Sequence, residues 1–330
     1  MDQIMNKGMG MSKRIALGLV FVGLLSGALV AHGQSFPNKP ITLVVPTTAG
    51  GTTDAIGRNV ANKMATALGQ AIVIQNRAGA GGAIGSAFVA KQPADGYTLL
   101  TITGANAVKF HMEPALAPNP IADLSAIGMV AKSSYVITAN AAAPYNSIPE
   151  LIEYARKNPG KVNYASAGNG SGGHLVMAML AARSRVNLTH VAYQGAPQLM
   201  PDLMSGRVDI YADTAVGALP NLSSGKVKAL AVTGAKRLST LPAVPTVTEA
   251  LPEFVFEIWY AIAGPKGLDP VVANKLNAAV EAALNDPSVK SWLASQSFDP
   301  VHATVEQTEK FVKADFVAMD QVASQAGLKP

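Results

Sequence analysis

The residues of this chain best suited to bind a ligand form a glycine-rich turn after its first strand-like run. Ile41 to Val45 favours a strand, Pro46 ends it, and a helix is predicted next because apolar residues recur every four positions from Ile56 to Leu68. A helix start leaves backbone N–H groups unpaired at the positive end of its dipole, and glycine lets a ligand approach them. The turn has no Lys or Arg, which favours a carboxylate held by backbone and hydroxyl donors over a polyphosphate. We assign ligand contacts here to Thr47, Thr48, Ala49, Gly50, Gly51, Thr52 and Asp54.

A second unit of the same kind lies in the other half of the chain. Val162 to Ala165 favours a strand, Ser166 to Gly173 is rich in glycine, and His174 to Ala182 favours a helix. If the two units face each other across a cleft, their loops hold opposite sides of one anion at the C-terminal ends of strands. We therefore add contacts from Ser166, Ala167, Gly168, Asn169, Gly170 and Ser171. Without this second copy, a tight turn with no ligand would explain Gly50-Gly51 equally well.

Three further polar residues are expected at strand ends that face the same cleft: Asn106, Tyr193 and Asp213. A carboxylate at position 213 would accept a hydrogen bond from a ligand N–H or O–H, and a structural cap for the helix at Ala215 is the competing interpretation. Asp54 is likewise a candidate cap for the helix that follows it. These residues are expected to discriminate among acids, whereas the glycine-rich loops bind any carboxylate.

Patterns that would indicate an enzyme are incomplete. Gly168 to Gly173 matches G-x-G-x-x-G, but the acidic residue expected about twenty positions later in a dinucleotide site is missing. Ser171 and His174 do not satisfy G-x-S-x-G, because Asn169 occupies the first glycine position. The histidines after the first forty residues are far apart and have no cysteine partner, which disfavours a zinc site. We predict no catalytic residue, no metal and no cofactor.

The first 33 residues have the pattern of a secretory signal peptide. Lys7, Lys13 and Arg14 precede the apolar run Ile15 to Val30, and Ala31-His32-Gly33 gives a small-x-small cleavage pattern before Gln34. Cysteine is absent, which excludes a disulfide scaffold and a lipid anchor beside the cleavage pattern. The net charge of +5 is scattered, with no basic stripe among aromatic residues, which disfavours nucleic-acid binding. We expect an exported, soluble protein.

Strand-like and helix-like segments alternate throughout the mature chain, which predicts α/β layers with mostly parallel sheets. We expect one lobe from residues 34–138 and 253–330 and a second from residues 139–252. Two crossovers, near Val136 to Asn140 and Glu253 to Ile258, would join the lobes and act as hinges. After the strand at Phe256 to Ala263, two helices, about Pro270 to Asn285 and Thr304 to Ala326, are expected to complete the chain.

The chain resembles the extracytoplasmic substrate-binding proteins of tripartite tricarboxylate transporters, also called the Bug family. The matching stretches are Ala49 to Asp54 with Arg58, Asn76 to Gly85, Pro93 to Leu100, Tyr164 to Ser171, Gly225 to Thr233 and Pro245 to Glu249. Two departures affect the ligand contacts: Ala78 replaces the usual proline of Asn-Arg-Pro-Gly, and Trp259-Tyr260-Ala261-Ile262 replaces Trp-x-Gly-Leu.

The resemblance implies a periplasmic protein with a type II binding-protein fold, in which a carboxylate lies between the two glycine-rich loops. The leading hypothesis is a monomeric solute receptor, not an enzyme, that delivers a small organic or amino acid to integral membrane transporter subunits. The alternative is a periplasmic sensing subunit that docks on a kinase ectodomain. The sequence does not select one acid.

Overall fold

Helices and strands alternate through residues 36–328, the part of the chain that this computed structural model describes. The strands are β1 (Ile41–Val45), β2 (Ile72–Asn76), β3 (Thr98–Ile102), β4 (Leu124–Asn140), β5 (Asn163–Ser166), β6 (Thr189–Ala192), β7 (Ile210–Thr214), β8 (Val227–Val232), β9 (Glu257–Pro265) and β10 (Asp299–Pro300). The helices are α2 (Thr52–Leu68), α3 (Ala83–Ala90), α4 (Gly104–Met112), α5 (Ile148–Lys157), α6 (Gly172–Ser184), α7 (Ala196–Ser205), α8 (Ala215–Leu222), α9 (Pro270–Asn285), α10 (Pro287–Ser295) and α11 (Val305–Gln325). This mixed α/β fold confirms the predicted class, while the predicted signal peptide lies outside the described residues.

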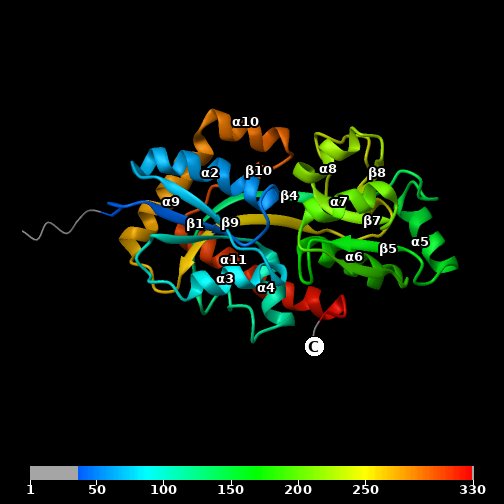
Figure 1. Ribbon diagram of the computed structural model, residues 1–330, viewed down its shortest axis with the longest axis horizontal. Helices are drawn as coiled ribbons and strands as arrows, with labels where there is room; N and C mark the ends of the chain where they lie inside the picture. Colours follow the sequence, from blue (N-terminus) through cyan, green and yellow to red (C-terminus); the bar gives the residue numbers. More distant parts are fainter. Residues whose placement is uncertain (1–35, 329–330) are drawn as a thin grey trace, which may run out of the picture. The chain divides into compact units, whose positions relative to one another are not determined.

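Within the described residues the strands join in the order β2-β1-β3-β9-β4-β7-β5-β6, and β8 and β10 also pair with β4. The long strand β4 changes partners along its length: Leu124 to Ser134 pairs with β9, whereas Tyr135 to Asn140 pairs with β7 and β8. We call β1, β2, β3, β9, β10 and the first part of β4 the first half-sheet. The second half-sheet comprises β5, β6, β7, β8 and the remainder of β4. Figure 1 shows β4 and β9 running between the two groups of elements.

The strand directions differ in one respect from the predicted mostly parallel sheets. The outer pairs β1/β2, β1/β3, β5/β6 and β5/β7 are parallel, but β9 pairs antiparallel with β3 and β4, and β4 pairs antiparallel with β7 and β8. The chain leaves the first half-sheet along β4 and returns along β9, so these two neighbouring strands run in opposite directions. The predicted lobes follow the chain in the same order as the two half-sheets, and the exact lobe boundaries stay a prediction.

Helices cover both faces of the first half-sheet, which explains its apolar strands. In Figure 1, α2, α9 and α10 lie on one side of β1 and β9, and α3 and α4 lie on the other. Leu43, Val44, Leu100, Ile102 and Ala261 are accordingly almost fully buried. Because helices pack on both faces, the half-sheet holds the C-terminal ends of β1 and β3 in fixed positions.

Two helices were not predicted from the sequence. Helix α4 begins where the chain reads as a strand end, because Thr103 and Asn106 form a capping box that starts a helix despite Gly104. Helix α10 follows α9 after a break at Asp286, whose side chain accepts from the Ser288 N–H and caps a helix with Pro287 at its first position. In both cases the decisive signal is a cap rather than a long apolar pattern.

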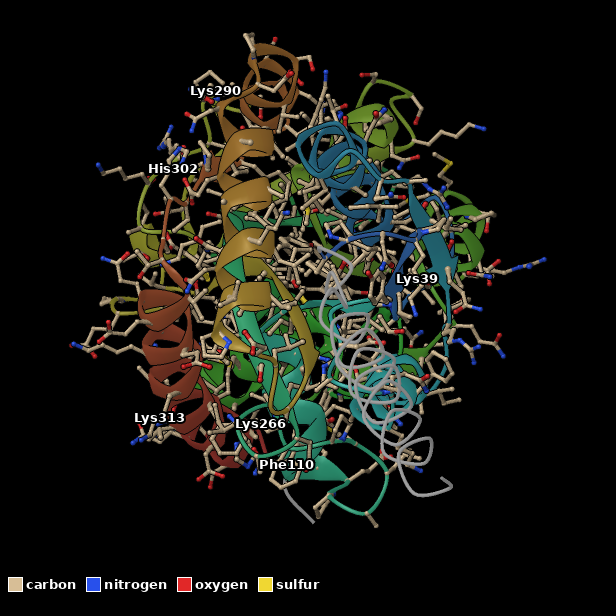
Figure 2. All side chains as sticks on the ribbon, turned by 90° about the vertical axis from the view of Figure 1, so that its left-hand side faces the viewer. Lys39, Phe110, Lys266, Lys290, His302 and Lys313 are labelled. Atoms are coloured by element: carbon tan, nitrogen blue, oxygen red, sulfur yellow. The ribbon has the colours of Figure 1, made fainter. Side chains whose placement is uncertain are left out.

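Charge is dispersed over the molecule rather than gathered. Figure 2 shows Lys290 on α10, Lys313 on α11, and Lys39 and Lys266 in two separate connecting segments. His302 in the same view pairs with Glu281, with 2.6 Å between His302 Nδ1 and Glu281 Oε2. Residues 36–328 contain no helix that is both long enough and apolar enough to span a bilayer.

Candidate ligand-binding site

A cavity of about 630 Å³ lies where loops from both half-sheets meet. Eleven of the predicted ligand residues line it, and five do not. Those that line it are Thr47, Thr48, Gly51, Thr52, Asn106, Ala167, Gly168, Asn169, Ser171, Tyr193 and Asp213. Those outside the lining are Ala49, Gly50, Asp54, Ser166 and Gly170. The two glycine-rich loops therefore meet at one cavity, although not every predicted residue faces it.

The first loop presents the start of α2 to the cavity. Gly51 is the N-cap residue and has no side chain to accept from the first turn, so the N–H groups of Thr52 and Thr53 remain available. Thr47 Oγ1 is buried with no hydrogen-bond partner among the described residues. A carboxylate in the cavity would satisfy these donors at the positive end of the helix dipole.

Asp54 and Gly50 build this loop rather than facing the cavity. Asp54 accepts from the Gly50 N–H at 3.0 Å, from Arg58 Nε at 2.9 Å and from Asn76 Nδ2 at 2.9 Å. Burial alone would raise the pKa of Asp54, but the hydrogen bonds from Arg58, Gly50 and Asn76 outweigh it and lower the pKa. The Asp54 carboxylate thus remains charged and ties the loop to α2 and β2, whereas the sequence predicted a ligand contact or a helix cap at this position.

The second loop has the same division between scaffold and lining. Gly168 N–H donates to Ser166 Oγ at 3.2 Å, and Gly170 N–H donates to His174 Nδ1 at 3.0 Å. These bonds explain why Ser166 and Gly170 lie outside the lining. Ser171 is the N-cap of α6, and its Oγ is buried without a partner among the described residues. The open first turn of α6 and this hydroxyl therefore form a second donor set.

Three stacked aromatic rings lie against the second loop, and two of them contact it through hydrogen bonds. The His174 and His190 rings are 3.9 Å apart and nearly parallel at 8°, and Tyr164 stacks on His190 at 4.8 Å. His190 Nε2 lies 2.7 Å from Ser166 Oγ. Burial, with smaller contributions from His190 and Lys109, lowers the pKa of His174 from 6.5 to about 4. A neutral His174 can accept the Gly170 N–H, so the loop conformation depends on this residue being unprotonated.

We predict that His174→Asn changes how stability depends on pH. Between pH 4 and 6.5 the unfolded chain binds a proton at His174 that the folded protein does not, so this residue adds stability that is lost as pH falls. The slope is at most about 1.4 kcal/mol per pH unit. Asn keeps an acceptor but does not titrate, so urea unfolding from pH 4.5 to 7 should give the variant a smaller rise. Equal slopes for both proteins would contradict the prediction.

The experiment must compare wild type with the His174→Asn variant, because Asp213 changes stability with pH in the opposite direction. Burial raises its pKa from 3.8 to about 7, so folding favours proton binding there and stability from this group falls as pH rises through that window. Both proteins contain Asp213, and its contribution cancels in the difference between them. The pH profile of the wild-type protein alone would therefore conceal the effect of His174.

Asn106 and Tyr193 line the cavity, but their polar atoms are engaged elsewhere. Asn106 Oδ1 accepts from the Thr103 N–H at 2.8 Å, and its Nδ2 donates to Ser86 Oγ at 2.8 Å. The Tyr193 hydroxyl donates to Asp202 Oδ2 at 2.8 Å. Their role in discriminating acids stays a prediction, and these bonds favour contact with the ligand through apolar surface.

Sequence reasoning did not assign several residues that line the cavity. Three are the buried tyrosines Tyr135 on β4, Tyr211 on β7 and Tyr260 on β9. Others include Ala78 to Gly82, Gln194 to Ala196, and the pair Lys109 on α4 and Glu113 at its C-cap. Lys109 is 2% exposed and bonds to Glu113 at 2.5 Å, so its ammonium is already paired. Among these residues, Ala78 to Gly82 lie in the Asn76 to Gly85 motif and Tyr260 lies in the Trp259 to Ile262 motif, so both had a signal in the sequence.

Loops from the two half-sheets touch each other around the cavity. Thr52 Oγ1 lies 2.6 Å from Thr214 Oγ1, although the two residues come from different half-sheets. A Cβ added to Gly168 would lie 3.6 Å from the Gly81 Cα, so these two glycine-rich segments meet backbone to backbone. These contacts between Thr52 and Thr214, and between Gly81 and Gly168, join the two loops across the cavity. No group of three His, Cys, Asp or Glu suited to a metal occurs within residues 36–328.

Known proteins are similar to this chain in sequence and in fold. The family model described as "Tripartite tricarboxylate transporter family receptor" matches residues 56–328. Protein BugT of Bordetella pertussis (strain Tohama I) is 33% identical over 324 residues, which cover 97% of this chain and 99% of that protein.

Three solved structures superpose closely on the chain. Periplasmic binding protein BugD gives a TM-score of 0.85 at 34% identity, covering 89% of this chain and 99% of its own. The structure of R. palustris Rpa4515 with adipate gives 0.85 at 33% identity, with the same coverage. MatC from Rhodopseudomonas palustris with bound malate gives 0.81 at 31% identity, covering 87% of this chain and 99% of its own.

Proposed function

The chain belongs to the tripartite tricarboxylate transporter receptor family, and on this premise we propose that it captures a small carboxylate and delivers it to a membrane transporter. Members of this family are binding proteins rather than enzymes. Similar structures hold adipate and malate, both of which are small dicarboxylates. The proposed site of action is the periplasm, after removal of a signal peptide near Gly33 and Gln34.

One observation carries the proposal: two helix N-termini open into the same cavity. The first turns of α2 and α6 offer backbone N–H groups, and the buried hydroxyls of Thr47 and Ser171 lie beside them without partners among the described residues. This arrangement suits a carboxylate, because its oxygens accept several hydrogen bonds and its charge is favoured at both helix ends. Neither set of donors includes Lys or Arg, the cations that would be expected in a site for a multiply charged phosphate.

A thermal-shift screen of organic acids, followed by calorimetry, tests the binding step. A ligand at 100 times its Kd should stabilise the folded protein by about 2.7 kcal/mol. Phosphate and an uncharged amide of the same acid serve as controls, and both should leave the melting temperature unchanged. Stabilisation by the amide equal to that by the acid would reject carboxylate recognition.

Delivery to a transporter needs a separate experiment. Solubilised membranes from the source organism are passed over the immobilised protein with and without the identified acid. Recovery of integral transporter subunits that depends on the acid supports the proposal. Recovery of a sensor kinase in their place would assign the receptor to signalling while leaving its carboxylate site intact.

A further inference from the structure

Asp213 is a buried carboxyl group in the wall of a cavity that is otherwise suited to an anion. The residue ends β7 and is 6% exposed. Its Oδ1 accepts from the Thr214 N–H at 2.8 Å, and the nearby Tyr211 side chain favours the ionised form of the carboxyl. Its Oδ2 nevertheless makes no hydrogen bond of good geometry with any described residue. Leaving a buried acceptor unpaired costs about 1–3 kcal/mol. A group from the ligand that donates to Oδ2 would remove this cost.

The position of this carboxyl is set by the backbone of α8. A Cβ added to Gly217 would collide with the Asp213 carboxyl, so the glycine is what leaves room for it. Asp213 does not cap the helix: Thr214 is the N-cap of α8, and no side-chain cap bond is formed. The competing interpretation of Asp213 as a helix cap therefore loses its support, and a role toward the cavity remains.

The groups around Asp213 are neutral hydroxyls rather than cations. Tyr135, Tyr211 and Tyr260 line the cavity, and burial raises the pKa of each phenol well above its ordinary value, so the three stay uncharged. Lys109 is the one cation in the cavity lining described here, and Glu113 already pairs with it. Burial raises the pKa of Asp213 to about 7, and wherever the group is ionised a second ligand carboxylate beside it would face a like charge with no cation to offset it.

We infer that Asp213 makes this receptor select carboxylates that also carry a hydroxyl or ammonium donor, which bonds to Asp213 Oδ2. The inference rests on the proposed function, in which the ligand carboxylate lies at the starts of α2 and α6. A site built to bond such a donor rejects the analogue that lacks it, because the buried acceptor then remains unpaired. The ligand class is therefore hydroxy acids and amino acids rather than unsubstituted diacids.

Calorimetry with matched pairs of acids tests this selectivity. Malate and aspartate each differ from succinate by one donor group, and glutamate differs from glutarate in the same way. The wild-type protein should bind the donor-bearing member at least about 10-fold more tightly. Asp213→Ala should abolish this ratio, because malate and aspartate lose their bond to Asp213 Oδ2 while succinate is freed from the like charge.

Two further variants separate selectivity from folding. Asp213→Asn keeps the volume and an acceptor oxygen but cannot ionise, so it should weaken aspartate, whose ammonium favours an ionised partner, more than malate even if the alanine variant does not fold. Asp209→Asn makes the same change outside the cavity, where the carboxylate accepts from the Asn163 N–H at 2.7 Å. The Asp209 variant should lose some stability and keep the wild-type ratio.

The outcomes distinguish this inference from the proposed function. If wild type binds succinate as tightly as malate and aspartate, or if the ratio survives in both Asp213 variants, the inference is overturned and the carboxylate receptor stands. If no acid in the series or in the wider screen binds, the proposed function falls and the inference falls with it.

Discussion

Replacing Gly51 with Val is expected to lower the affinity for the carboxylate about 10³-fold in a protein that still folds. Gly51 lines the cavity directly before α2, where the N–H groups of Thr52 and Thr53 have no partner in the helix. An isopropyl group at this position would lie between those donors and the ligand. Losing two hydrogen bonds to a charged group, each worth about 1.5–3 kcal/mol, gives an effect of this size.

The backbone at Gly51 accepts the change without strain. Its φ of −82° and ψ of 170° are favourable for valine, and the new Cβ would lie 3.6 Å from the Thr48 carbonyl oxygen, an ordinary contact. Valine is a poorer N-cap than glycine, so a loss of about 1 kcal/mol in stability is expected. Urea unfolding measures that loss, and calorimetry with the best acid from the screen measures affinity.

Ala49→Val is the matched control for this substitution. Ala49 is exposed in the same loop and does not line the cavity. The control should bind with wild-type affinity. Unchanged affinity in the Gly51 variant would remove the start of α2 from the binding site and leave only the second loop.

Local signals explain which parts of the fold the sequence predicts. The run Ile41 to Val45 and the helix Pro270 to Asn285 have the bounds expected, because apolar residues in a regular pattern and clear breakers mark both ends. The glycine-rich loops are recognisable for the same reason: a strand, a turn and a helix follow one another within a short stretch. Their meeting at one cavity does not follow from either unit alone, because β1 and β5 belong to different half-sheets and run in opposite directions.

Local sequence patterns could not predict contacts between residues that are far apart in the chain. Asp54 was assigned to the ligand because its type and position fit, yet its partner Asn76 lies on the next strand and turns it into a scaffold residue. Tyr135, Tyr211 and Tyr260 come from three strands that are far apart in the chain. Only the sheet order places them together, so no spacing in the sequence could reveal the wall around Asp213.

The second large effect is expected at Gly81, where loops from the two half-sheets are in contact. Gly81 lies between β2 and α3, and a Cβ added there would overlap the Asn169 carbonyl oxygen of the second loop. Forcing extra atoms into a packed contact costs about 1–3 kcal/mol, and the two loops must separate to avoid it. Gly81→Ala should therefore disfavour the closed cavity and weaken acid binding about 10²-fold.

The backbone angle of Gly81 requires a matched control, because its φ of +65° already strains any other residue. Gly225 has a similar φ of +70°, and a Cβ added there would meet nothing within 4 Å. Gly225→Ala thus carries the same backbone penalty of about 1–2 kcal/mol without the collision. Both variants should lose similar stability in urea, and only Gly81→Ala should lose affinity.

Small-angle scattering then tests whether the lost affinity reflects an open cavity. In the wild-type protein, saturation with the acid should reduce the radius of gyration, because only the closed form brings both sets of donors to the ligand. The Gly81 variant should keep the larger radius at the same acid concentration, whereas the Gly225 variant should close. If the Gly81 variant binds and closes like wild type, the contact between Gly81 and Asn169 has no part in closure, and the predicted hinges at Val136 to Asn140 and Glu253 to Ile258 lose this support.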